Sequence, residues 1–362
     1  TPGCFAPSPL PDFFSPEKLT PALSRDQVKR KIELVVNGAA FLQSCGFEGA
    51  EIHAMHWGYL LDEFAMTMTN QREDEYGGSL ENRMRVAKEI AEGIKQVCGT
   101  SFALSMRLGL KSYMKDFNKA TLTGEGEVGR SLEEGVRIAQ MLEAYGYDCL
   151  SVDAGVYDSF YYAAPPSYMP KGHVLDLAAA AKKVVTIPIL CGSRMNGMGL
   201  AENAVKDGII DAIVLARPSL ADPELPKKVE VGCPERIRPC IGCNQNCIGR
   251  LLVGGRVGCA VNPQGAREHS FGLEPALQKK KLLVVGGGVA GMELSRTAAL
   301  RGHQVELHEK SGHLGGRLLP AGVHDFKKEL LELNDWYQQE LERLPNVEIH
   351  LNSALTAEDI AK

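Results

Sequence analysis

The chain has 362 residues, with 45 acidic and 40 basic side chains and a formal net charge of −5. Without a long basic run it gives no indication of a nucleic acid or an anionic membrane as partner. No apolar stretch reaches the roughly 18 residues needed to cross a bilayer. The first residues lack the basic and apolar regions of a secretory signal, and we therefore expect a cytoplasmic protein.

Residues 24–230 alternate amphipathic helices with short β-branched runs. Ser24 is the predicted cap of a first helix that stops at Gly46. Strand–helix alternation at this pitch predicts parallel strands with crossover helices. Five strands are predicted, and they end near His53, Arg107, Asp153, Gly192 and Ala216. A closed (β/α)8 barrel needs eight strands, so we expect the C-terminal part of a TIM barrel, its last five strands, in residues 1–230.

Residues 231–275 are rich in Gly, Pro and Asn and contain four closely spaced cysteines, Cys240, Cys243, Cys247 and Cys259. A Cys4 zinc site also uses Cys-x2-Cys pairs and is the alternative. Three bunched cysteines followed by a distant fourth favour a [4Fe–4S] cluster, which would act as an electron relay. The remaining cysteines are scattered in apolar surroundings, which is typical of reduced core residues.

Residues 276–362 begin with a strand, a glycine turn, a helix and a second strand. The turn "VVGGGVAG" supplies Gly286, Gly288 and Gly291 as G-x-G-x-x-G, and Glu309 ends the next strand. Such glycines let a pyrophosphate approach the helix N-terminus, while the carboxylate takes ribose hydroxyls. A second turn at Gly315, Gly316 and Arg317 favours FAD over NAD. This region predicts the N-terminal, incomplete part of a Rossmann-like FAD/NAD(P)-binding domain.

Arginines and small residues follow the last two strands of the first region. In barrels the loops at these positions bind phosphate, and paired arginines suit a phosphate dianion. Ion pairs with neighbouring acids at the barrel rim are the alternative. The candidate phosphate ligands are Gly192, Arg194, Ala216 and Arg217.

The stretch "EIHAMHWGYLLDEF" places His53, His56 and Tyr59 at or just past a strand end. Two histidines three apart are metal candidates, but no third ligand sits at a suitable offset. Imidazoles that donate to a substrate carbonyl oxygen, beside a phenol that gives up a proton, fit better, and half-buried structural polar groups are the alternative. Tyr157 follows another strand end and is either part of an aromatic wall for a flat ligand or core beneath a loop.

The chain as a whole resembles the iron–sulfur flavoenzyme branch of the old yellow enzyme family, that is, 2,4-dienoyl-CoA reductases and 2-enoate reductases. The resemblance is carried by "CIGCNQNC" with the later Cys259, "TNQREDEYGGSLENR", "LARPSLADPEL" and "GGGVAG", in this order. Trimethylamine dehydrogenase is similar, but it has two residues rather than three before its third cysteine. Trp57 lengthens the loop before Tyr59 relative to many relatives and favours the enoate reductase type.

The resemblance implies a TIM barrel with FMN, a [4Fe–4S] cluster and an FAD domain that receives electrons from NAD(P)H. It implies reduction of the C=C bond of an α,β-unsaturated acid, an enoyl- or dienoyl-CoA, or a related enone.

The resemblance also implies roles for individual residues. FMN N5 would give hydride to the β-carbon, and Tyr59 would protonate the α-carbon. His53 and His56 would hold the carbonyl oxygen, and Arg107 would face the flavin N1/C2 edge. Gly192, Arg194, Ala216 and Arg217 would hold the FMN phosphate. Tyr157 stands where dienoyl-CoA reductases have a second acid, normally histidine, so its role as a substrate-contacting residue is open.

The resemblance also implies that the chain is a fragment lacking both ends of a longer protein, and we expect such a fragment to be poorly stable alone. The expected partner is a small unsaturated substrate, with no nucleic acid and no membrane, and a homo-oligomer is left open. The other functions that the residues leave open are amine dehydrogenation, a non-catalytic electron-transfer subunit and a zinc-stapled scaffold.

Overall fold

The computed structural model describes residues 5–195 and 197–361, which form two compact units. The first unit comprises the residues up to 165 together with residues 170–214. The second comprises residues 166–169 and those from 215 onward. Among the described residues, no helix combines the length and apolar character that a membrane crossing requires.

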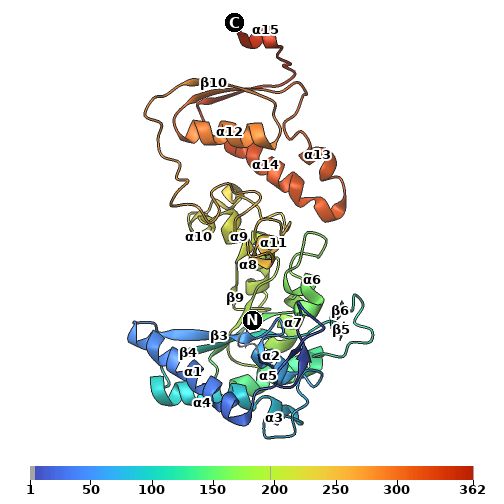
Figure 1. Ribbon diagram of the computed structural model, residues 1–362. Helices are drawn as coiled ribbons and strands as arrows, with labels where there is room; N and C mark the ends of the chain where they lie inside the picture. Colours follow the sequence, from blue (N-terminus) through green and yellow to red (C-terminus); the bar gives the residue numbers. More distant parts are fainter. Residues whose placement is uncertain (1–4, 196, 362) are drawn as a thin grey trace. The chain divides into compact units, whose positions relative to one another are not determined.

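The first unit is built around a five-stranded parallel sheet, as the strand–helix alternation predicts. Its strands lie side by side in chain order, and Figure 1 shows β3 and β4 running together with α1 and α4 packed along them. Leu104, Met106 and Leu108 of β4 are fully buried. All five predicted strands are confirmed, and β3 extends two residues beyond His53. They are β3 (Gly49–Met55), β4 (Ala103–Gly109), β7 (Cys149–Asp153), β8 (Ile189–Cys191) and β9 (Ala212–Ile213).

The helices of this unit begin and end largely where their capping residues predict. Ser24 and Gln27 form a capping box at the start of α1, and Gly46 with φ 89° follows its end. The helical stretch that follows Ser79 consists of two helices that meet at Met84. The helices are α1 (Arg25–Ser44), α3 (Leu80–Arg83), α4 (Arg85–Cys98), α5 (Leu132–Ala144), α7 (Leu175–Lys182) and α8 (Met198–Lys206).

Short elements that the sequence analysis missed surround the carboxyl ends of the strands. Each spans only two to six residues, too few for a hydrophobic period to be recognised. They are the antiparallel pairs β1 (Leu10–Pro11) with β2 (Leu19–Thr20) and β5 (Met114–Asp116) with β6 (Lys119–Ala120), and the helices α2 (Leu60–Ala65), η1 (Tyr157–Ser159) and α6 (Phe160–Ala163).

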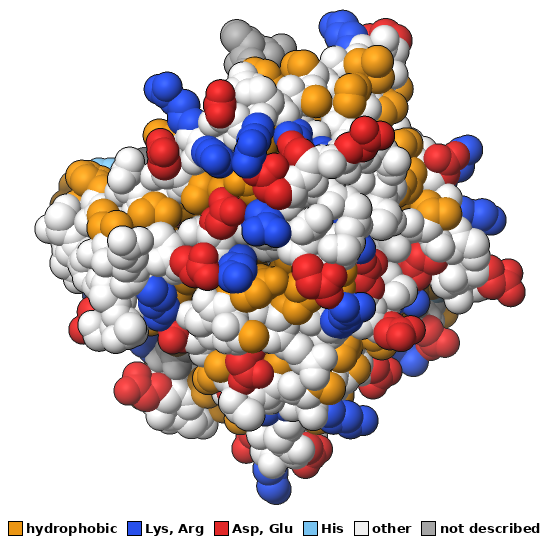
Figure 2. Space-filling view, turned by 90° about the horizontal axis from the view of Figure 1, so that it is seen from below, with side chains coloured by type: hydrophobic (Ala, Val, Ile, Leu, Met, Phe, Trp, Pro, Cys, Tyr) orange, Lys and Arg blue, Asp and Glu red, His pale blue; other side chains and the backbone are white. Residues whose placement is uncertain are grey.

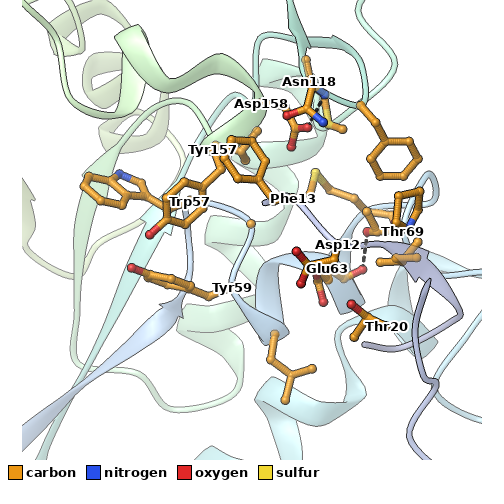
Figure 3. Close-up of a pocket in the computed structure, with 18 of the residues that line it drawn as sticks. Asp12, Phe13, Thr20, Trp57, Tyr59, Glu63, Thr69, Asn118, Tyr157 and Asp158 are labelled. Carbon is orange, nitrogen blue, oxygen red and sulfur yellow. Dashed lines mark hydrogen bonds between the residues drawn. The ribbon is translucent and has the colours of Figure 1, made fainter. Parts of the chain in front are cut away.

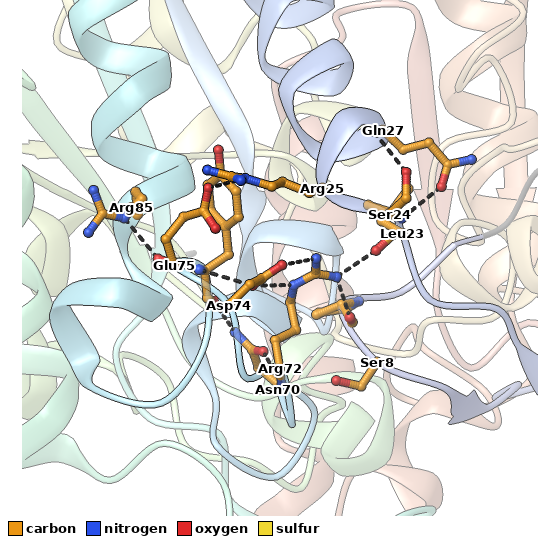
Figure 4. A network of polar contacts seen from close by, with 12 residues as sticks. Ser8, Leu23, Ser24, Arg25, Gln27, Asn70, Arg72, Asp74, Glu75 and Arg85 are labelled. Carbon is orange, nitrogen blue, oxygen red and sulfur yellow. Dashed lines mark hydrogen bonds and ion pairs between the residues drawn. The ribbon is translucent and has the colours of Figure 1, made fainter.

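Arg72, in the "TNQREDEYGG" stretch, ties the N-terminal segment to the loop after α2. Its guanidinium donates to the carbonyls of Pro7 (2.9 Å) and Leu23 (2.6 Å) and forms an ion pair with Asp74 (Figure 4). This motif therefore has a structural role, since it fixes the segment that carries β1 and β2. On the face shown in Figure 2, basic and acidic side chains are interspersed rather than gathered by sign.

The second unit contains a three-stranded parallel sheet in the order β10-β11-β12. The predicted strand, glycine turn, helix and strand are confirmed, and a third strand, β12, follows near the end of the chain. The long helix α14 was not predicted, although it supplies the buried side chains of Leu333, Trp336, Tyr337 and Leu341. The elements are β10 (Lys281–Val285), α12 (Val289–Leu300), β11 (Gln304–His308), α13 (Leu318–Ala321), η3 (Asp325–Lys327), α14 (Glu329–Glu342), β12 (Val347–His350) and α15 (Ala357–Ala361).

The cysteine segment packs on the same hydrophobic core as this sheet. Cys240, Ile241 and Cys259 lie against the buried cluster that includes Trp336, whose indole nitrogen donates to the carbonyl of Arg236 at 2.9 Å. The segment is mostly irregular, as its Gly, Pro and Asn content predicts. Its short helices and those just before it are α9 (Arg217–Ala221), α10 (Leu225–Glu230), η2 (Pro234–Arg236) and α11 (Ile248–Leu252).

Candidate active site and nucleotide-binding turn

The structure brings His53, His56 and Tyr59 together at the carboxyl end of β3. The centroids of the two imidazole rings are 4.3 Å apart, and the Tyr59 ring lies 5.6 Å from His53 and 5.4 Å from His56. His53 is on the strand, His56 follows its last residue, and Tyr59 caps α2. The three side chains predicted to act on one substrate therefore share one site.

A buried carboxylate that the sequence analysis did not assign holds this site in place. Asp153, the last residue of β7, is 1% exposed, and one of its oxygens accepts from Arg107 Nε at 2.9 Å and meets His56 Nδ1 at 3.0 Å. Burial alone would raise the pKa of Asp153, but His56 and Arg107 hold the pKa below its ordinary value. Its position at the end of a strand, two residues past the register partner of Arg107, is the signal that could have found it.

The contact with Asp153 fixes the protonation pattern of His56. Since an ionised carboxylate only accepts, Nδ1 carries the hydrogen, and Nε2 of the neutral ring is an acceptor that becomes a donor only in the imidazolium. His56 Nε2 is buried and has no hydrogen-bond partner among the described residues. Burial and the nearby charges of His56 and Arg107 lower the pKa of His53. We expected both imidazoles to donate to the substrate, but the free nitrogen of neutral His56 is an acceptor.

Tyr59 is held in its protonated form. Burial, followed by a hydrogen bond with Tyr157, raises the pKa of Tyr59 to about 12. The two rings are 6.1 Å apart and meet edge to face. A phenol that keeps its proton at neutral pH is the form that a proton donor requires.

A cavity of about 550 Å³ opens beside Tyr59. Figure 3 shows Phe13, Trp57, Tyr59 and Tyr157 grouped along one side of it, while Asp12, Glu63, Thr20 and Thr69 lie on the other. Burial, followed by the neighbouring Asp62 and Asp158, raises the pKa of Glu63 to about 8. Tyr157 thus lines a cavity, as an aromatic wall would. Tyr162 instead stacks on Tyr113 with centroids 3.8 Å apart and is 8% exposed, so it belongs to the core.

The four residues predicted to bind the FMN phosphate fall in both units. Gly192 and Arg194 belong to the first unit, where Ser193 and Arg194 have φ 66° and 54° and turn the chain after β8. Ala216 and Arg217 belong to the second unit, where Arg217 Nη1 donates to Asn244 Oδ1 at 2.6 Å. Their shared role stays a prediction.

The four clustered cysteines line one small cavity. Arg217 and Asn244 line it as well, and burial raises the pKa of the Cys240 thiol to about 11. Within residues 5–195 and 197–361, no three His, Cys, Asp or Glu side chains are placed to hold a single metal ion. Four thiols around one cavity are a donor set suited to a group with several metal atoms, such as an iron–sulfur cluster.

The glycine turn after β10 has the geometry that a nucleotide requires. Gly286 has φ 105°, and a Cβ added to Gly291 would lie 1.9 Å from the Gly286 carbonyl oxygen. Glu309, just after β11, accepts from the backbone of Gly287 at 2.7 Å and of Ser311 at 2.8 Å. These bonds lower the pKa of Glu309 and keep its carboxylate ionised.

The second glycine turn packs directly on the first. Gly315 donates to the carbonyl of Gly287 at 2.8 Å, and a Cβ on Gly316, whose φ is 50°, would lie 3.1 Å from Gly288 Cα. Arg317 caps α13 immediately afterwards. The residues predicted from the two motifs therefore meet in one place, and their cradle fits a dinucleotide.

Comparisons with known proteins agree with these observations. Residues 12–236 match the NADH:flavin oxidoreductase / NADH oxidase family, and residues 284–330 match an NAD(P)-binding Rossmann-like domain. The chain is 46% identical over 357 residues to a cinnamate reductase of Clostridium sporogenes, covering 98% of this chain and 54% of that protein. It is 39% identical over 361 residues to an NADH oxidase of Thermoanaerobacter brockii, covering 98% and 53%.

Among solved structures, a 2-naphthoyl-CoA reductase in complex with 2-naphthoyl-CoA superposes with a TM-score of 0.90 at 34% identity. The match covers 98% of this chain and 52% of that one. The chain thus spans about half the length of the relatives it matches.

The fold and the two sites place the chain among α/β proteins with a strand-end site and a nucleotide-binding glycine turn. The chain belongs to the NADH:flavin oxidoreductase / NADH oxidase family, and the resemblance to the iron–sulfur flavoenzyme branch of old yellow enzyme is confirmed. FMN and NAD(P)H are the cofactors that these family matches support.

Proposed function

We propose that the protein containing this chain is an NAD(P)H-dependent reductase of conjugated C=C bonds, with α,β-unsaturated acids among its substrates. The observation that carries the proposal is the convergence of Tyr59, His53 and His56 beside an aromatic cavity, with Asp153 and Arg107 behind them. The similarity to cinnamate and naphthoyl-CoA reductases supports this substrate class.

FMN, when bound at the strand ends, supplies hydride to the β-carbon of the alkene. Tyr59 donates its proton to the α-carbon, for which its raised pKa keeps the phenol protonated. His53 holds the substrate carbonyl oxygen and stabilises the negative charge that develops on it, and His56 would add a second donor at Nε2 only as the imidazolium. Arg107, anchored by Asp153 and Ser151, presents positive charge beside them.

We further propose that residues 1–230 are the last five strands of a TIM barrel, that residues 231–275 hold a [4Fe–4S] cluster and that residues 276–362 begin an FAD domain. Cys240, Cys243, Cys247 and Cys259 would ligate the cluster, since all four line one cavity. The cradle of Gly286, Gly288, Gly291 and Gly316, with Glu309, would bind the FAD pyrophosphate and ribose. The cluster would carry electrons between the two flavins.

The proposal is tested by changing Tyr59→Phe in the intact holoenzyme. We expect the alkene half-reaction, measured by anaerobic stopped-flow with cinnamate, to slow by about 10²–10⁴-fold. Reduction of FMN by NAD(P)H should proceed at the wild-type rate, because no proton transfer from Tyr59 is involved. Equal loss in both half-reactions would remove Tyr59 from the role of proton donor.

A further inference from the structure

Trp57 has an unusual backbone for a bulky residue. Its φ is 58°, in the left-handed region, a strained conformation that a bulky residue keeps only when its surroundings impose it. Its carbonyl accepts from Tyr157 at 3.2 Å, and the next residue, Gly58, donates to Asp62 at 2.8 Å. Asp62 is fully buried and paired with Arg130. The turn that presents Trp57 is therefore fixed by the protein around it.

The indole of Trp57 is the centre of an aromatic cluster. Tyr157 and Phe160 meet it edge to face, with centroids 5.8 and 5.7 Å away, and His56 and Tyr59 lie 5.5 and 6.5 Å away. Trp57 also lines the cavity beside Tyr59 (Figure 3). A side chain held by four aromatic neighbours has a defined direction for its polar atom.

That polar atom is not satisfied. Trp57 Nε1 is buried without a hydrogen-bond partner among the described residues, and so is His56 Nε2 on the preceding residue. A buried donor left unpaired is destabilising, and buried tryptophans normally donate to an acceptor. The unpaired indole N–H, beside the predicted proton donor Tyr59, indicates a ligand that brings an acceptor oxygen of its own to Trp57.

We propose that the Trp57 indole N–H binds the second oxygen of a free carboxylate on the substrate, while His53 binds the first. This inference rests on the proposed function and narrows it to unsaturated acids in preference to ketones and thioesters. A carboxylate has two strong acceptor oxygens, whereas a ketone or thioester has one carbonyl oxygen, and a thioether-like sulfur is a weak acceptor.

The experiment compares two substrates that share the phenyl ring and the alkene, trans-cinnamate and its methyl ketone, 4-phenylbut-3-en-2-one. In the holoenzyme, Trp57→Phe should lower the acid-to-ketone ratio of kcat/KM by about tenfold or more, since a hydrogen bond to a charged group contributes about 1.5–3 kcal/mol. Replacing Trp57 with 3-benzothienylalanine, which keeps the bicyclic shape and removes only the N–H, should give the same change. Binding of the saturated acid 3-phenylpropionate, followed by flavin absorbance, should weaken in parallel.

Phe160→Leu is the matched control, because it disturbs the same cluster without removing a donor, and the acid-to-ketone ratio should stay as in the wild type. An unchanged ratio in both Trp57 variants, or the same change of ratio in Phe160→Leu, would overturn the inference while leaving the reductase activity standing. If the wild-type holoenzyme reduces neither substrate, the proposed function itself fails, and the inference fails with it.

Discussion

The strand-end site of the first unit and the glycine turn of the second solve the binding problem in different ways. At the strand ends, side chains from β3, β4 and β7 converge, and a buried carboxylate orients them. At the glycine turn the backbone itself forms the site, and the single side chain, Glu309, is held by backbone N–H groups. The first site depends on tertiary partners distant in sequence, whereas the second is nearly local.

The largest expected effect separates the two sites by the partners of their carboxylates, which are side chains for Asp153 and backbone N–H groups for Glu309. Asp153→Ala leaves the partly buried Arg107 without its counter-charge and the buried His56 Nδ1 without its acceptor, and should lower the free energy of unfolding by about 3–5 kcal/mol. Glu309→Ala, which removes acceptors from two backbone donors, should cost about 1–2 kcal/mol. Urea denaturation of the holoenzyme variants measures both, and equal losses would erase the distinction.

A second prediction tests the backbone site by sterics. Gly291→Ala places a Cβ 1.9 Å from the Gly286 carbonyl oxygen, so the turn must open, at a cost of about 1–3 kcal/mol. We expect FAD to be lost on gel filtration while FMN is retained. The control is Gly199→Ala in α8, where an added Cβ meets nothing within 4 Å and should stabilise the helix by about 0.5–1 kcal/mol. Full FAD retention in Gly291→Ala would contradict the cradle.

A smaller effect concerns the support of the cysteine segment. The Trp336 indole nitrogen donates to the Arg236 carbonyl, and the ring centroid lies 4.6 Å from the guanidinium carbon of Arg238. Nη1 of Arg238 in turn donates to the Val261 carbonyl at 2.8 Å. Trp336→Phe should cost about 1–2 kcal/mol and make the iron of the holoenzyme more readily extracted by a chelator. Arg137→Gln, at a surface ion pair with Glu81, is the control and should leave iron retention unchanged. Equal iron loss in both variants would show that Trp336 does not support the cysteine segment specifically.

The smallest predicted effect concerns pH: the proton donor should stay protonated, so that it causes no fall in the rate of the alkene half-reaction at alkaline pH. Since Tyr59 loses its proton only near pH 12, the alkene half-reaction should keep its proton donor from pH 7 to pH 10. A phenol with the ordinary pKa near 10 would already be half ionised at the upper end of this range. A fall of about twofold between pH 9 and pH 10 in single-turnover measurements, absent from Tyr59→Phe, would show an unshifted phenol.

The features that the sequence predicted are those with a repeating hydrophobic pattern and those that depend on the special properties of glycine and cysteine. The five parallel strands, the capped helix at Ser24 and the turn with Gly286 and Gly291 follow from local patterns, and the structure confirms them. Asp153 was not assigned, because its importance arises only when β3 and β4 bring His56 and Arg107 to it. The strained turn at Trp57 likewise depends on Asp62 and Arg130, a pair that sequence spacing does not reveal.

The most direct test is to ask whether the cysteine cavity holds an electron relay. Anaerobically purified holoenzyme should contain iron and acid-labile sulfide at about four each per chain. NAD(P)H should produce the EPR signal of a reduced cluster, and cinnamate should then abolish it as the alkene is reduced. One zinc per chain without iron, or a reduced cluster that cinnamate leaves unchanged, would contradict electron transfer from the nucleotide-binding domain to the strand-end site.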